Sequence, residues 1–155
     1  MKVIISDPIS EDGLRVLKDN NIEIINANGQ NIDEITSHIK TADGWIIRSG
    51  TILDSKIIEK TDNLSVIGRA GVGVDNIDIS AATRRGIVVM NTPDANTISA
   101  AEHTMALILA LSRNVSYGHH GLSKGEWNRH LLIGSELHGK TIGVVGLGKI
   151  GREVI

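Results

Sequence analysis

Three glycines near the C-terminal end of the chain are spaced as in a turn that holds a phosphate group. Residues 144–155 read VVGLGKIGREVI, so that Gly146, Gly148 and Gly151 form the pattern G-x-G-x-x-G after an apolar stretch. The first glycine allows a tight turn, the second lets a pyrophosphate approach the backbone, and the third lets a following helix pack closely on the strand. The N–H groups at the start of that helix can donate to the phosphates. We therefore expect this turn to contact a dinucleotide, with a plain tight turn as the alternative.

The glycine pattern does not distinguish NAD from NADP. The acidic residue that would hold the ribose hydroxyls of NAD is expected about 20 residues further on. That position would lie beyond Ile155, so the residues themselves leave the choice of dinucleotide open.

A second glycine-rich stretch has an arginine beside it and could bind an anion. Residues 67–78 read IGRAGVGVDNID, in which Gly71 and Gly73 follow an apolar strand pattern and Asp78 can cap a helix. Successive N–H groups in such a turn can form a concave anion site, and Arg69 adds a positive charge. The alternative is that the glycines only let the chain reverse, and the residues favour neither interpretation.

A second arginine follows another apolar run. Residues 46–51 read IIRSGT, which puts Arg48 and Ser49 directly after the third predicted strand. In a parallel sheet, ligands bind outside the carboxyl ends of the strands, so Arg48 and the loop at 69–76 are expected to face one crevice. Together they favour an anionic ligand, although a solvated surface charge is the commoner role for a single arginine.

The histidines do not form a recognisable site. His119 and His120 are adjacent rather than one helical turn apart, and a solvated loop explains them better than a metal site. His103 falls within a helical pattern and is expected to be packed or to lie in an interface, while His130 and His138 have no recognisable partner. We predict no metal site and no catalytic histidine, and no serine nucleophile pattern is present.

These candidate residues need a framework of alternating strands and helices. Amphipathic segments around Ile9–Leu17, Ile32–Ile39 and Ile57–Ile58, the last with a candidate cap at Asp54, separate short β-branched runs. Continuous apolar strands that alternate with helices are typical of an α/β fold whose parallel sheet is covered on both faces. The predicted strands are residues 2–5, 22–25, 44–47, 64–68 and 86–90.

The pattern changes after the fifth predicted strand. Residues 91–96 read NTPDAN, which predicts a turn and a hinge. Thr97 can cap a helix that continues to about Leu111 and is apolar nearly all round, so we expect that helix to be buried on most sides, between domains or subunits. Residues 139–146 predict a new strand that leads into the glycine turn.

Composition excludes several classes of function. The formal net charge of -2 offers no basic surface for nucleic acid or for an anionic membrane. The chain has no cysteine, so it has neither disulfides nor thiolate metal ligands. The longest apolar stretch, 98–111, is shorter than a membrane span, and the N-terminal residues do not resemble a signal peptide. We expect a cytoplasmic protein that contacts neither nucleic acid nor membrane.

Taken together, these segments resemble the D-2-hydroxyacid dehydrogenases, and among them the phosphoglycerate dehydrogenases. The resemblance is carried by residues 46–51, 67–111 and 124–154 and extends over essentially the whole chain. It implies a flavodoxin-like substrate-binding domain at residues 1–94, followed at 95–155 by the incomplete start of a Rossmann NAD-binding domain. It also implies the NAD-dependent oxidation of 3-phosphoglycerate to 3-phosphohydroxypyruvate, the first step of serine biosynthesis, by a homodimer or higher homo-oligomer.

The resemblance also assigns roles to residues. It implies substrate contacts for Arg48, for Ser49 and for the backbone of Gly71, Val72 and Gly73, beside the charge of Arg69. Asn96 would be a hinge residue near the substrate, and Arg129 would reach into a neighbouring subunit. The cofactor contacts would be Val72 at the nicotinamide and, at the pyrophosphate, Lys149 and Ile150 together with Gly146, Gly148 and Gly151. Where other members carry Thr, this chain has Val72, so that only a backbone or apolar contact remains. The helix from residue 97 resembles the dimer-forming element.

The family's catalytic Arg, Glu and His come from later segments, so no catalytic residue is assigned and these 155 residues alone are expected to be inactive. The alternatives are a non-catalytic module that binds an anion or another subunit, and a dehydrogenase for another D-2-hydroxyacid. A phosphoacceptor signalling domain would need an aspartate where Arg48 stands.

Overall fold

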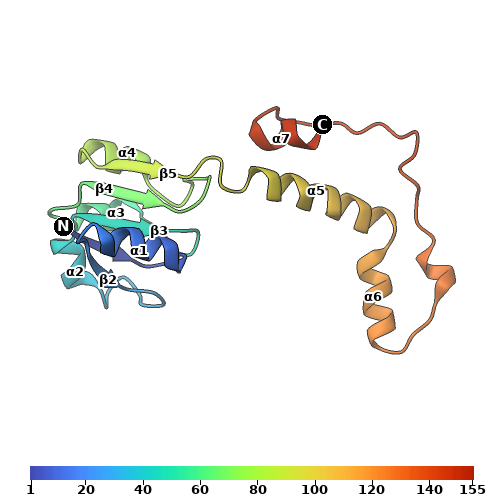
Figure 1. Cartoon of the computed structure of the whole chain (residues 1–155), viewed down its shortest axis with the longest axis horizontal. Helices are drawn as coiled ribbons and strands as arrows, with labels where there is room; N and C mark the ends of the chain where they lie inside the picture. The colour runs from blue at the N-terminus through green and yellow to red at the C-terminus, as the bar shows by residue number, and fades with distance from the viewer. The chain divides into compact units, whose positions relative to one another are not determined.

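The computed structural model describes all 155 residues and divides them into two compact units, Met1–Ala95 and Asn96–Ile155. The first unit contains five strands and four helices, and the second contains helices only (Figure 1). Each unit has its own internal packing, and each is described separately below.

The first unit is built on a five-stranded sheet in which every neighbouring pair of strands is parallel. The strand order β2-β1-β3-β4-β5 is that of flavodoxin-like doubly wound folds. Three strands lie one or two residues later than predicted, because their ends are set by pairing with a neighbour, as when Gly44 aligns with Val66 and Val66 with Val88. The strands are β1 (Lys2–Ile5), β2 (Glu23–Asn26), β3 (Gly44–Ile47), β4 (Val66–Arg69) and β5 (Val88–Asn91).

Four helices connect these strands, and three of them begin at a side-chain cap. The caps predicted at Asp54 and Asp78 are confirmed, since their carboxylates accept hydrogen bonds from the N–H groups of Ile57 and Ala81 at 2.9 and 2.8 Å. Ser10 caps the first helix in the same way. The helices are α1 (Glu11–Asp19), α2 (Thr36–Thr41), α3 (Ser55–Glu59) and α4 (Ile79–Arg84).

One face of the sheet carries the main core of the first unit. Right-handed crossovers in this strand order put α2, α3 and α4 on the same face and α1 on the other. Side chains alternate along each strand, so Trp45 and Ile47 point to the face with three helices, where they are fully buried. The cluster there joins Ile4, Trp45, Ile47 and Ile67 of the strands to Ile35, Ile39, Ile58, Ala81 and Ala82 of the helices.

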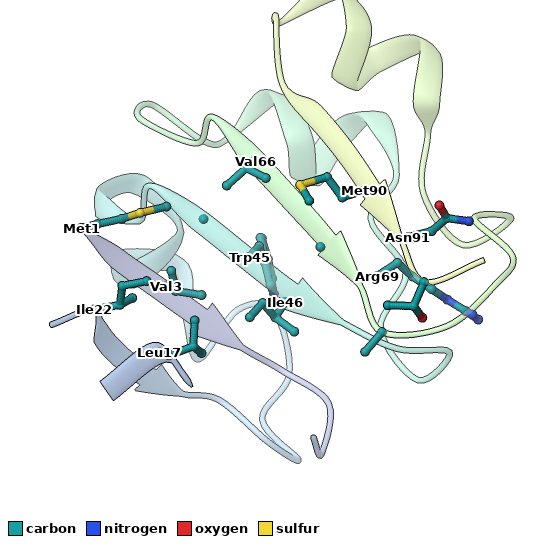
Figure 2. Close-up of a pocket in the computed structure, with 14 residues that line it drawn as sticks. Met1, Val3, Leu17, Ile22, Trp45, Ile46, Val66, Arg69, Met90 and Asn91 are labelled. Carbon is teal, nitrogen blue, oxygen red and sulfur yellow. The ribbon is translucent and has the colours of Figure 1, made fainter. Parts of the chain in front are cut away.

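The opposite face is only partly covered, so the prediction of a sheet covered on both faces is wrong in part. Helix α1 packs over β1 through Leu17, while the sheet beyond it forms an apolar hollow of about 340 Å³ (Figure 2). Val88 and Met90 of β5 remain 58% and 57% exposed. The cause is topological, because β1-α1-β2 is the only crossover on this side.

The second unit contains α5 (Thr97–Ser112), α6 (Val115–Ser123), a 3₁₀ turn η1 (Arg129–Leu132) and α7 (Lys149–Val154), which packs on α5. The predicted cap at Thr97 is wrong, because Asn96 is the N-cap and makes no side-chain capping bond. The predicted strand at 139–146 is also wrong, since a strand needs a hydrogen-bonded neighbour and this segment pairs with none.

Helix α5 is much more exposed than its composition predicts. Ala101 is its one buried residue, while Leu107, Leu109 and Leu111 are each at least half exposed. Within its own unit, α7 packs on only part of the surface of α5, and burial of the helix between domains or subunits stays a prediction. None of the helices has both the length and the apolar character needed to cross a membrane.

Candidate functional site

A pocket of about 630 Å³ lies at the carboxyl edge of the first unit's sheet. Loops that follow β1, β3, β4 and β5 all contribute to it, as expected where parallel strands end together. Arg48 and Ala70 both line this pocket, so the structure brings the arginine loop and the start of the 69–76 loop to one crevice. The remaining lining residues are Pro8, Ile9, Ser10, Gly13, Leu17, Ile46, Thr92 and Ala95.

Arg48 and Ser49 are exposed at this edge and available to a ligand. The Arg48 guanidinium makes one long hydrogen bond, from Nη1 to the Pro8 carbonyl oxygen at 3.4 Å, and it has no carboxylate partner. An unpaired guanidinium beside a hydroxyl is suited to a phosphate or carboxylate, which accepts several hydrogen bonds at once.

The backbone that carries Arg48 is held by two residues that sequence reasoning missed. The Asp7 carboxylate accepts hydrogen bonds from the N–H groups of Arg48 and Thr51, and the Asn76 amide donates to the carbonyl oxygens of the same two residues. A signal was present in the sequence, since Asp7 follows β1 and Asn76 follows β4, two places where side chains gather at the carboxyl edge.

The loop at 69–76 differs from the concave anion site considered above. Neither Gly71 nor Gly73 has a positive φ, so neither adopts the left-handed conformation of an αR-αL nest. The Gly71 N–H donates to the Arg69 carbonyl oxygen at 2.8 Å and is not available to a ligand. Gly71 instead leaves space for the Arg69 guanidinium, which a Cβ at this position would overlap. The Gly71 N–H is therefore not part of an anion site, and anion binding by the rest of the loop stays a prediction.

The loop still offers donors to a ligand. Asn91 donates to the Val72 carbonyl oxygen at 2.7 Å, and the Thr92 N–H donates to that of Gly71 at 2.9 Å, so the loop is tied to the end of β5. The N–H groups of Val72 and Gly73 make no hydrogen bond within the chain. Arg69 is part-buried, and its Nε has no hydrogen-bond partner. The two free N–H groups form a donor-rich edge after β4; Ala70 of this loop lines the Arg48 pocket, while Arg69 lines the hollow on the face of the sheet.

The glycine turn of the second unit has the backbone features that a pyrophosphate requires. Gly146 has a φ of 100°, which favours glycine, and a Cβ at Gly151 would overlap the Gly146 carbonyl oxygen. Gly148 is the N-cap of α7, with open space where its Cβ would lie. The turn therefore fits a dinucleotide phosphate, and Lys149 and Ile150 form the first turn of the helix beside it.

The remaining candidates lie in the second unit. Asn96 and Arg129, the first residue of η1, are both exposed. His119 and His120 are exposed on helix α6, so the prediction of a loop there is wrong. His103 is exposed on α5 rather than packed within the chain, and no three His, Asp or Glu side chains cluster as a metal site requires.

Curated relatives align with the whole chain. It is 48% identical over 156 aligned residues to the D-3-phosphoglycerate dehydrogenase of Methanocaldococcus jannaschii and 46% identical over 154 to that of Archaeoglobus fulgidus. The alignments cover 100% and 99% of this chain, but the chain spans only 29% of each relative's length.

Solved structures share the fold over the same range. The TT0316 protein of Thermus thermophilus superposes with a TM-score of 0.88 at 33% sequence identity. An NAD-dependent formate dehydrogenase of Staphylococcus aureus, solved in complex with NAD, superposes with a TM-score of 0.89 at 31% sequence identity. Both matches cover 99% of this chain and about half of the other, 51% and 52%. Residues 3–147 match the family described as D-isomer specific 2-hydroxyacid dehydrogenase, catalytic domain. The chain is thus a homologue of D-3-phosphoglycerate dehydrogenase and belongs to the D-isomer specific 2-hydroxyacid dehydrogenase family.

Proposed function

We propose that this chain provides the substrate-binding unit and the first part of the nucleotide-binding unit of an NAD-dependent phosphoglycerate dehydrogenase. The reaction is the oxidation of 3-phosphoglycerate to 3-phosphohydroxypyruvate, which is the first step of serine biosynthesis. Identities of 46–48% to curated relatives of that name support the assignment. The observation that carries it is the unpaired, exposed Arg48 at the edge of a pocket that Ala70, at the start of the loop after β4, also lines.

In this proposal the two ends of the substrate bind to different donors. The Arg48 guanidinium and the Ser49 hydroxyl bind the phosphate, since a planar guanidinium can donate two parallel hydrogen bonds to it. The free N–H groups of Val72 and Gly73 bind the carboxylate, and the charge of Arg69 lies beside them. A substrate anchored at both ends presents its hydroxyl-bearing carbon in one orientation, which is how binding energy assists the chemical step.

The glycine turn holds the cofactor in the same scheme. NAD, when bound, supplies the group that accepts the hydride from the hydroxyl-bearing carbon. In this chain the backbone at Gly146, Gly148 and Gly151, with Lys149 and Ile150, would hold its pyrophosphate. We therefore assign residues 1–94 to a substrate-binding domain and 95–155 to the opening of a Rossmann domain.

The 155 residues do not include a group that we assign to proton removal. Hydride can leave the alcohol carbon only as a general base takes the hydroxyl proton, and the histidines of this chain do not match the family's catalytic motif. The chain alone is thus expected to bind substrate without turning it over. Absorbance of NADH with 3-phosphoglycerate and NAD present should stay flat, and enzyme-like production of NADH would contradict the proposal.

Helix α5 is proposed as a contact between subunits of a homo-oligomer. Leu107 and Leu111 lie one helical turn apart on one side of it and are 57% and 82% exposed within the chain. Contiguous exposed apolar surface of this kind commonly marks an interface.

The substrate assignment is tested by mapping ligand contacts on the chain itself. Titration with 3-phosphoglycerate should shift the backbone amide NMR signals of Arg48, Ser49, Val72 and Gly73, whereas glycerate, which lacks the phosphate, should shift those of Arg48 and Ser49 much less. Equal responses to both compounds would favour a dehydrogenase for another D-2-hydroxyacid. Shifts confined to other parts of the chain would contradict the proposed site.

A further inference from the structure

We propose that Asp7 and Asn76 are positioning residues that hold the Arg48–Thr51 loop in its ligand-binding shape. This inference rests on the proposed function, because it assigns the source of order in the same anion site. Neither residue is needed to contact the ligand in this scheme. Both act through the backbone of the loop that carries Arg48 and Ser49.

Asp7 holds the loop through its N–H groups. Its Oδ2 accepts hydrogen bonds from the N–H of Arg48 at 2.6 Å and of Thr51 at 3.1 Å. The residue is only 8% exposed, and a buried carboxylate is tolerated where several donors satisfy it. The loop also fits closely around Asp7, because a Cβ at Gly50 would overlap its Oδ1. Glycine at position 50 is therefore part of the same arrangement.

Asn76 holds the loop through its carbonyl groups. Its Nδ2 donates to the carbonyl oxygens of Arg48 and Thr51, each at 2.6 Å. Both partners are acceptors, so only the NH₂ end of the side chain can face them. Its Oδ1 is buried without a partner in the chain, and burying an unpaired acceptor lowers the stability of the fold. The two bonds that Nδ2 donates offset that loss. Aspartate at this position would place negative oxygens against both carbonyl groups.

The two side chains together close the loop into a rigid unit. Arg48 and Thr51 are each held twice, at the N–H by Asp7 and at the carbonyl oxygen by Asn76, and the two residues between them span the gap. The Thr51 hydroxyl is also within 2.9 Å of the Ser6 hydroxyl, which accepts a hydrogen bond from the buried Trp45 indole at 2.9 Å. The loop is thus anchored to the sheet, and the entropy of ordering it is lost on folding rather than on ligand binding.

Replacement of Asp7 by Asn should change anion binding in opposite directions depending on whether Asp7 positions the loop or only contributes its charge. Asp7 is an acidic residue close to a proposed anion site, so replacing it by Asn removes a repulsion and should strengthen anion binding if charge alone matters. If Asp7 positions the loop, the same substitution should weaken binding, because a neutral amide oxygen accepts from the two N–H groups more weakly than the charged oxygen that now holds both. Asp7→Asn therefore separates the two explanations.

The experiment uses the 155-residue chain with 3-phosphoglycerate as the probe. We expect Asp7→Asn to weaken binding, measured by NMR titration, by about ten-fold or more, and to accelerate hydrogen exchange of the Arg48 and Thr51 amides. Asp62→Asn makes the same charge change at an exposed position before β4 and should alter neither quantity. Asn76→Ala tests the other side of the loop by the same two measurements, and it decides the question if Asp7→Asn does not fold.

The two proposals fail in different ways. Unchanged or tighter binding by the folded variants overturns the positioning role, whatever the exchange rates. If the wild-type chain does not bind 3-phosphoglycerate, the proposed function fails, and the exchange rates then decide whether Asp7 and Asn76 order the loop. Exchange of the Arg48 and Thr51 amides that is the same in wild type and variants overturns the inference in that case as well.

Discussion

At the scale of single residues, the site is organised by close approaches that glycine allows. The consequences differ between Gly50 and Gly71. At Gly50 an added Cβ would meet the carboxylate of Asp7, which two backbone N–H groups hold in place. At Gly71 it would meet the end of the long Arg69 side chain, which can move away.

Gly50→Ala should therefore destabilise the first unit. The expected loss is about 1–3 kcal/mol of unfolding free energy, the usual range for forcing extra volume into a packed position. Urea unfolding can be followed by the fluorescence of the buried Trp45, since Trp127 is already 65% exposed in the folded chain. The control is Gly68→Ala, whose Cβ would make an ordinary contact at 3.7 Å. Equal stability of both variants would contradict the packing described for Gly50.

Gly71→Ala should instead leave stability nearly unchanged and weaken binding of 3-phosphoglycerate. Displacement of the Arg69 guanidinium moves a positive charge away from the donor-rich edge after β4. Calorimetric titration beside urea unfolding measures both quantities on one sample. A large loss of stability together with unchanged affinity would show that the arginine is structural only.

The residue scale also shows where sequence reasoning succeeds. Local signals identified the caps at Asp54 and Asp78, because a cap and its N–H partner are three residues apart. By contrast, Asp7 and Asn76 bond to Arg48 from positions that are 41 and 28 residues away in the sequence. Such pairs depend on which strand ends meet, which one sequence does not specify. Arg48 was found because it follows a recognisable strand.

At the scale of elements, strand pairing decides which of the apolar runs in the sequence form strands. All five strands of the first unit lie within two residues of the predicted runs, whereas residues 139–146 have the same character and form no strand. The difference is the presence of a neighbour that can supply the backbone hydrogen bonds. Helix α5 also needs a neighbour that the sequence does not identify, because its apolar composition predicts burial but does not say which surface would cover it.

The short helices of the first unit should depend on their caps. Asp78→Ala removes the acceptor for the Ala81 N–H and should reduce the unfolding free energy by about 1 kcal/mol, while Asp78→Ser, which restores an acceptor, should recover most of the loss. Asp62→Ala removes an exposed carboxylate that makes no cap and serves as the control. Equal losses for Asp78→Ala and Asp78→Ser would indicate that another property of the carboxylate, such as its charge, is responsible.

At the scale of the whole molecule, each unit has an apolar surface that its own elements leave uncovered. One is the hollow on the face of the sheet, which residues of β1, β3, β4 and β5 line, and the other is the exposed side of α5. The family profile matches nearly the full length, yet the chain spans only 29% of its curated relatives. Exposed apolar surface on this scale favours association.

We accordingly expect the chain to self-associate. Sedimentation should give a mean mass that rises above the 16.6 kDa of one chain as concentration increases. Leu107→Glu with Leu111→Glu, one helical turn apart on α5, should reduce the association, while Val16→Glu, at an apolar position of α1 that is 62% exposed, should not. A mass that stays at one chain over the whole concentration range would contradict this expectation.

The central claim is that the carboxyl edge of the first unit binds a phosphorylated hydroxyacid through Arg48. The most direct measurement is calorimetric titration of the chain with 3-phosphoglycerate, comparing wild type with Arg48→Ala and with Arg15→Ala, which removes an exposed arginine of α1. We predict that wild type and Arg15→Ala bind alike and that Arg48→Ala binds at least about ten-fold more weakly, because it loses charge-assisted hydrogen bonds to the phosphate. Equal affinity of Arg48→Ala and wild type, or no binding by wild type, would contradict the account.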